Sequence, residues 1–101
     1  MNTQKLLYVC VLEKTKTYNK INKALVIKHV DFLRELDDNG QLALCGISKG
    51  APGVAGMIIL KAENIDEAKE ICKLEPLTEA GHTKAVISTL QVADRENNYL
   101  L

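Results

Sequence analysis

Apolar residues along the chain gather in short runs, interrupted by one long segment of helical period. The first run, Leu6 to Leu12 (LLYVCVL), contains two valines and a tyrosine and is followed by a polar stretch, which is typical of a β-strand. From Asn22 to Asp38 the apolar residues recur with the period of an amphipathic helix. Asn19 or Asn22 can cap the start of this helix, and Asn39-Gly40 supplies the left-handed residue that ends it.

Two further apolar runs are separated by a turn sequence and followed by a second helical pattern. Gln41–Ser48 and Val54–Ala62 flank the loop KGAPG, which predicts a β-hairpin. Asn64, with Glu67 three positions later, resembles a capping box and predicts the start of a second helix. We expect this helix to end before Pro76.

The remaining segments complete a βαββαβ order. Thr78–His82 (TEAGH) predicts a short turn, and Thr83–Val92 carries enough Val, Ile and Thr for a last strand. This order predicts an α+β, ferredoxin-like fold with a four-stranded antiparallel sheet and both helices on one face. The length of 101 residues predicts a single domain over residues 1–101.

Both faces of the predicted sheet are apolar. In the third strand, alternate positions on one face and on the other are occupied almost entirely by apolar residues: Gly56, Ile58 and Leu60, and Ala55, Met57 and Ile59. Helices on one side would leave a large apolar patch on the other, which soluble monomers seldom expose. We therefore expect a homodimer in which two sheets pack face to face as a dimeric α+β barrel. Tyr99 to Leu101 either packs on the partner or frays.

Composition and charge narrow the classes of partner. Lys plus Arg and Asp plus Glu number 13 each, which removes the basic footprint of a nucleic-acid or anionic-membrane binder. No apolar run approaches the ~20 residues that span a bilayer, and Lys14 and Lys16 end the first run too early for a signal peptide. We expect a cytoplasmic protein. Cys10, Cys45 and Cys72 are far apart, and each lies in an apolar pattern, as reduced core thiols do.

His29 is the most informative polar residue because it lies at the centre of the apolar stripe of the first helix. A buried imidazole needs a hydrogen-bond partner, and it serves either as a general acid or base or as a packed core histidine. Glu75, after the second helix, either orients His29 or is a solvated helix-end residue. Tyr8 and Ser48 lie in strands, where their hydroxyls either bind substrate in a cavity or are structural.

Other kinds of site lack their sequence patterns. Cys10 is not followed by the second cysteine of a C-x-x-C metal carrier. The third strand has Met57 and aliphatic residues where an RNA-recognition sheet has stacking aromatics. Gly50 to Gly53 has neither the spacing nor the following helix of a phosphate-binding loop. We expect no metal and no cofactor.

Several motifs between about Leu7 and Val92 occur in a recognisable order. They are an LYV strand, His29 followed by Leu33 and Leu36, N-G-Q-L-A-L-C-G at Asn39 to Gly46, D-E-A-K at Asp66 to Lys69, and E-P-L-T-E-A-G at Glu75 to Gly81. This order resembles the YCII-related (YciI-like) family of dimeric α+β barrel proteins, which has G-R-L-x-x-x-G and D-P-x-x-x-A-G at the third and last of these positions.

The resemblance implies a ferredoxin-like protomer, a dimer through the sheets, and a His-Asp pair that falls here on His29 and Glu75. It also implies a link to small-molecule chemistry, since one member resembles a dehydrochlorinase acting on a substituted hydroquinone and the fold is similar to that of muconolactone isomerase. Three positions depart from the family pattern. Glu75 replaces the aspartate, Val26 replaces an arginine that would contact an anion, and Ile47 replaces a proline.

The leading hypothesis is a lyase or isomerase that transfers a proton on a small cyclic or aromatic compound. In it, His29 is the acid or base, Glu75 orients His29, and Tyr8 or Ser48 fixes the substrate. One alternative is a non-catalytic dimer that binds or senses a small ligand, and a second is a purely structural partner protein.

Overall fold

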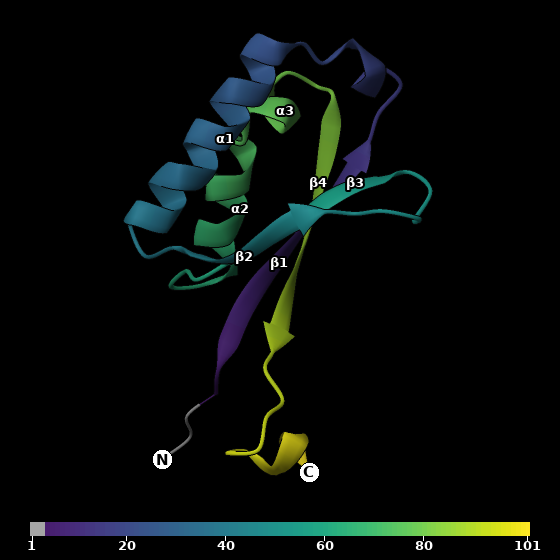
Figure 1. Ribbon diagram of the computed structural model, residues 1–101. Helices are drawn as coiled ribbons and strands as arrows, with labels where there is room; N and C mark the ends of the chain where they lie inside the picture. The colour runs from purple at the N-terminus through teal and green to yellow at the C-terminus, as the bar shows by residue number, and fades with distance from the viewer. Residues whose placement is uncertain (1–3) are drawn as a thin grey trace.

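The computed structural model describes residues 4–101, and its elements follow the predicted order (Figure 1). The strands are β1 (Leu6–Lys14), β2 (Leu42–Ile47), β3 (Val54–Leu60) and β4 (Thr83–Gln91). The helices are α1 (Lys23–Asp38), α2 (Ile65–Lys73) and the single-turn α3 (Pro76–Glu79), with 3-10 turns η1 (Tyr18–Lys20) and η2 (Asn98–Leu100). The antiparallel sheet has the strand order β2-β3-β1-β4, which confirms the predicted ferredoxin-like α+β fold.

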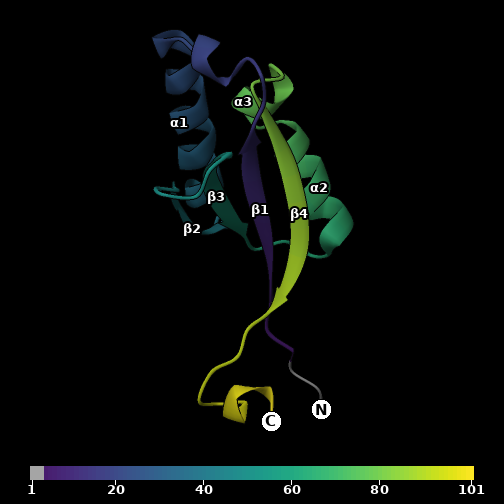
Figure 2. The same ribbon diagram turned by 90° about the vertical axis from the view of Figure 1, so that its right-hand side faces the viewer.

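Helices α1 and α2 lie on the same side of the sheet (Figures 1 and 2). The core lies between the two helices and the sheet. It consists of alternate strand residues and of the residues of both helices that face the sheet: Tyr8, Cys10, Leu12, Ile58, Leu60, Leu36, Ala68 and Cys72. The register explains this set, because Tyr8 pairs with Leu60 and Cys10 with Ile58, so these side chains share one face of the sheet. Burial of this face is the main source of stability available to so small a chain.

The opposite face of the sheet is also apolar, as the alternation predicts. Val9 pairs with Ile59, and Val11 pairs with both Met57 and Val86. No helix of residues 4–101 covers these side chains, and Met57 and Val86 are exposed. We call this surface, with Leu44 and Leu90, the outer face.

The predicted helix caps are present at both long helices. Asn22 Oδ1 accepts a hydrogen bond from the backbone N–H of Leu25 at 2.9 Å, and Asn64 Oδ1 accepts one from Glu67 at 2.8 Å. Beyond α1, Gly40 adopts a φ of 73°, which a glycine reaches without strain. The choice between Asn19 and Asn22, which the sequence left open, falls on Asn22.

The segment after α2 differs from the predicted turn. Thr78 and Glu79 belong to the extra helix α3, so the turn predicted over Thr78–His82 is wrong at its start. Pro76 opens this helix at its first position, where the fixed φ of proline suits a helix and its missing N–H is not needed. Glu75 is the N-cap residue, and its Oε2 accepts a hydrogen bond from the N–H of Thr78 at 2.8 Å.

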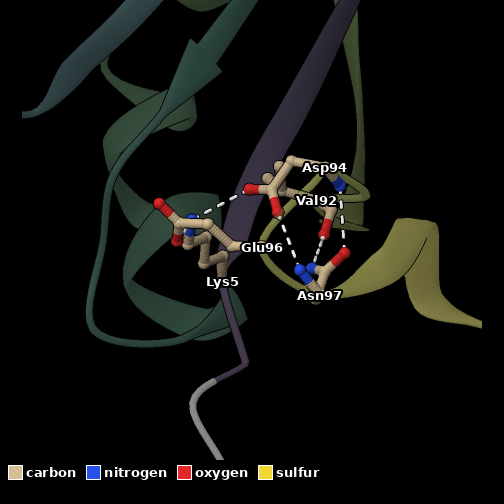
Figure 3. Close-up of polar contacts among 5 residues, drawn as sticks. All are labelled: Lys5, Val92, Asp94, Glu96 and Asn97. Atoms are coloured by element: carbon tan, nitrogen blue, oxygen red, sulfur yellow. Dashed lines mark hydrogen bonds and ion pairs between the residues drawn. The ribbon is translucent and has the colours of Figure 1, made fainter.

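The C-terminal tail is held against the start of β1 by polar contacts (Figure 3). Lys5 Nζ contacts Asp94 Oδ2 at 2.8 Å and Glu96 Oε2 at 2.6 Å. Asp94 and Asn97 exchange hydrogen bonds, each side chain accepting from the other's backbone N–H. These contacts fix the tail as far as Asn97, while Tyr99 and the following leucines stay exposed.

Gly56 is the position where the sheet tolerates a side chain least. A Cβ on this residue would lie 2.4 Å from the carbonyl oxygen of Gly46, a backbone atom of the neighbouring strand. We predict that Gly56→Ala lowers the free energy of unfolding by roughly 1–3 kcal/mol in urea denaturation, because β2 must move to make room. Gly46→Ala is the matched control, since its Cβ meets nothing within 4 Å. Equal losses in the free energy of unfolding for the two substitutions would contradict the close approach of Gly56 to the backbone of Gly46.

Candidate functional site

His29 and Glu75 come from two elements that the fold brings together. His29 lies midway along α1, and Glu75 caps α3, which contacts α1 (Figure 1). The Nδ1 of His29 is hydrogen-bonded to the Oε1 of Glu75. The Glu75 side chain is 0% exposed, whereas that of His29 is 21% exposed. The partner of the histidine is thus a buried carboxylate, and not the backbone carbonyl that a purely packed core histidine would use.

The surroundings of Glu75 favour its ionised form. Burial raises the pKa of the Glu75 carboxyl, but hydrogen bonds from His29 and from the backbone amides of Thr78 and Leu77 lower it by more, so that the net pKa lies below the ordinary value. The carboxylate is therefore charged at neutral pH. Its two oxygens are both engaged, one by the imidazole and one by the first turn of α3.

The ionised carboxylate decides which nitrogen of His29 carries a proton. A carboxylate only accepts hydrogen bonds, so Nδ1 must donate to it, and the lone pair of a neutral ring resides on Nε2. Nε2 makes no hydrogen bond to another described residue, and no side-chain nitrogen or oxygen of those residues is buried without a partner. Nε2 is therefore open to solvent, free to accept a proton from a bound molecule.

His29 lines a cavity of about 370 Å³ between α1 and the β2–β3 end of the sheet. Most of the wall is apolar: Leu12, Ile21, Val26, Val30, Leu33, Gly46, Ile47, Ala55, Gly56, Met57, Ile58 and Leu77. The other lining residues are Tyr18, His29 and Cys45. This is the composition of a small-molecule site, with a few polar groups set in an apolar surface.

The sequence did not single out two polar residues of this wall. Tyr18 enters from η1, and the ammonium of Lys14 lies 4.9 Å from the centroid of its ring. Such a cation–π contact stabilises an exposed pair by roughly 0.5–1 kcal/mol. Cys45 was expected to be a core thiol but is exposed, unlike Cys10 and Cys72, because it lies on edge strand β2 and borders the open cavity beneath α1. Of the cavity wall, the sequence indicated only that Val26 and His29, three residues apart on one helix, lie on the same helix face.

The structure places Tyr8 and Ser48 outside this cavity. Tyr8 is buried in the core between the sheet and the helices, where it pairs with Leu60 of β3. Ser48 follows β2, and its backbone N–H donates to the carbonyl of Ala55 at 3.0 Å. Neither residue is among those that line the His29 cavity. The sequence-predicted site residues that the fold brings into contact are His29 and Glu75 alone.

The described part of the chain, residues 4–101, holds no cluster of three or more His, Cys, Asp or Glu side chains suited to a metal ion. None of its helices has the length and apolar character required to cross a bilayer.

Comparison with known proteins places these features in context. The YCII-related domain matches residues 6–90. A solved structure of 5-chloro-2-hydroxyhydroquinone dehydrochlorinase (TftG) from Burkholderia phenoliruptrix AC1100, in complex with 2,5-dihydroxybenzoquinone, is similar to this chain with a TM-score of 0.71. The identity is 17%, and the match covers 91% of this chain and 99% of that one, so it shows a common fold. A search of curated proteins gave no significant match.

The buried carboxylate predicts a specific dependence of stability on pH. Because the pKa of Glu75 in the folded protein lies below the ordinary value of 4.5, its charge stabilises the fold above about pH 4.5, and this contribution is lost as the pH falls through the folded-state pKa. We predict that Glu75→Gln lowers the free energy of unfolding by roughly 1–3 kcal/mol at pH 7, and that the deficit shrinks below pH 4.5. Urea denaturation across this pH range measures it.

Glu79→Gln is the matched control, since Glu79 is an exposed residue of the same short helix. Its deficit should stay within about 0.5 kcal/mol at every pH. A deficit for Glu75→Gln that does not change with pH would contradict the ionised state of the buried carboxyl.

Proposed function

This chain belongs to the YCII-related family, and from that premise we propose that it is a proton-transfer enzyme, a lyase or isomerase that acts on a small cyclic or aromatic compound. The observation that carries the proposal is the hydrogen bond between Nδ1 of His29 and the buried Glu75. It leaves Nε2 as a base on the wall of an apolar cavity large enough for a single ring.

In this proposal the two site residues have separate tasks. His29 takes a proton from the substrate on Nε2, and can return it at another position or to a leaving group. Glu75 holds the ring in the required tautomer and stabilises the imidazolium that forms, as a carboxylate does for a catalytic histidine. We assign no substrate contact to Tyr8 or Ser48, since neither lines the cavity.

The likeness to the dehydrochlorinase supports the substrate class. That protein is named for removing chloride from a substituted hydroquinone and holds a dihydroxylated quinone ring. A ring of this size fits the cavity volume of about 370 Å³. The apolar wall of the present cavity supports the same general kind of molecule, a small ring bearing few polar groups.

We further propose that the working form is a homodimer joined through the outer face. The apolar side chains of this surface are exposed on β2, β3 and β4 and half-buried on β1, and pairing it with a second copy would bury them between two sheets. The exposed apolar residues beside His29, Val26 and Val30 among them, lie near the β2 edge of the same sheet.

The catalytic role of His29 predicts a large loss of rate without a matching loss of binding. The assay screens small ring compounds, 5-chloro-2-hydroxyhydroquinone among them, for binding and then follows halide release and deuterium uptake from D₂O by NMR. We predict that His29→Gln lowers the rate about 10²–10⁴-fold, the usual contribution of a general base, with ligand affinity changed only a few-fold.

His82→Gln is the control, since the chain has 2 histidines and the second hydrogen-bonds with Thr17 Oγ1 at 2.7 Å, outside the cavity. It should keep the rate of the unmodified protein. Binding without any exchange or turnover would instead indicate a ligand-binding protein, and full activity of His29→Gln would exclude His29 as the base.

The proposed dimer predicts that a charge on the outer face separates the protomers. We predict that the unmodified chain of 11.2 kDa sediments as a dimer and that Val86→Glu sediments as a monomer, because a carboxylate buried in an apolar interface has no partner. Ile27→Glu, at an exposed position of α1, should remain dimeric. Sedimentation of the unmodified chain as a stable monomer would refute the dimer.

A further inference from the structure

Within residues 4–101, the wall of the His29 cavity lacks permanently charged side chains. Among its described lining residues there is no lysine, arginine, aspartate or glutamate. The residues best placed to supply a charge beside the imidazole are apolar: Val26, one helical turn before His29, is 45% exposed, and Ile47 on β2 is 81% exposed. A ligand in this cavity meets no cationic side chain of the wall.

The charged group in direct contact with the imidazole disfavours an anionic ligand. Glu75 lies directly behind His29 with its carboxylate ionised, so a negatively charged ligand beside a neutral imidazole would be repelled. Lys14 is not a lining residue, and its ammonium is placed on the ring of Tyr18. Moving an anion from water into an apolar cavity without a compensating cation is unfavourable.

We propose that this cavity selects an uncharged, weakly acidic ring compound, such as a phenol, and rejects the same ring when it carries a carboxylate. The inference rests on the proposed function, because it names the class of substrate for that site. During transfer the O–H bond of the ligand breaks, its electron pair stays on the phenolic oxygen, and the proton bonds to Nε2 of His29. The same transfer thus creates the negative charge on the ligand and the imidazolium of His29 beside it.

Cys45 provides a built-in reporter of ligand binding. It is an exposed thiol and lines the cavity, whereas Cys10 and Cys72 are buried. Alkylation of Cys45 by iodoacetamide, followed by mass spectrometry, therefore reports whether the cavity is occupied. The probes are resorcinol, which is uncharged at neutral pH, and 3-hydroxybenzoate, which has the same ring with a carboxylate in place of one hydroxyl.

In the unmodified protein we expect resorcinol at millimolar concentrations to protect Cys45, with 3-hydroxybenzoate binding at least about tenfold more weakly. Calorimetry gives both affinities independently of the thiol. Equal affinities, tighter binding of 3-hydroxybenzoate, or no protection by resorcinol would each overturn the inference. If 3-hydroxybenzoate binds and Lys14→Met abolishes that binding, Lys14 is the missing cation and the inference is likewise wrong.

A charge added to the wall should reverse the preference. We expect Val26→Arg to gain about tenfold or more in affinity for 3-hydroxybenzoate, because the guanidinium pairs with the carboxylate. Ile27→Arg adds the same charge to the next position of α1, 52% exposed and outside the wall, and should leave both affinities unchanged. Ile47→Lys, on the exposed β2 strand, is a second wall variant should Val26→Arg not fold.

A gain for Ile27→Arg equal to that of the folded wall variants would overturn the assignment of the cavity as the binding site. Binding is measured here without turnover, so the two proposals can fail separately. A protein that prefers resorcinol but exchanges no proton disproves the reaction alone. Turnover that depends on His29 but uses a carboxylated ring disproves the charge selection alone.

Discussion

The contact between a buried carboxylate and an imidazole determines the chemistry that this fold can support. Glu75 is fully buried, and such a charge is tolerated only where hydrogen bonds compensate for the lost water. Here one oxygen is bound by the first turn of α3 and the other by His29 of α1. The same contact links two elements distant in sequence and fixes the orientation of the ring.

The single-turn helix α3 is what makes this contact possible. Glu75 is the N-cap of a new helix that Pro76 begins, and in this position one carboxylate oxygen accepts from the N–H of Thr78 while the other meets His29 of α1. The two long helices pack on the face of the sheet that carries Tyr8, Cys10 and Leu12. The cavity opens at the β2 edge of that face, beneath α1. The change of chain direction at Glu75 and Pro76 thus places the carboxylate against the imidazole that lines the cavity.

The sequence predicted the fold well because its signals are local. Helical period over Asn22–Asp38, two asparagine caps and the KGAPG turn each specify one element, and the order of elements then leaves few topologies. The sequence left open whether Glu75 contacts His29 or is solvated, because the contact depends on how α1 and α3 pack. Helix α3 was not expected, since proline was interpreted only as a helix terminator and not as the first residue of the next helix.

The residues of the cavity wall could not be predicted from the sequence, for a related reason. Tyr18 lies in a polar segment between two elements, and Cys45 lies in an apolar run, so neither pattern indicated that the two line one cavity. Tyr8 had a stronger sequence signal but packs in the core. Which polar residue faces a cavity depends on strand order and on which edge the helices leave open, and both are properties of the assembled sheet.

The tautomer of His29 tests the central arrangement most directly. Long-range ¹⁵N–¹H correlation NMR on the folded protein, recorded at a pH where the ring is neutral, distinguishes a proton on Nδ1 from one on Nε2. The contact with an ionised Glu75 requires the proton on Nδ1 and a free lone pair on Nε2. A ring protonated on Nε2 would contradict it, since that ring could neither donate to Glu75 nor accept a proton from a ligand.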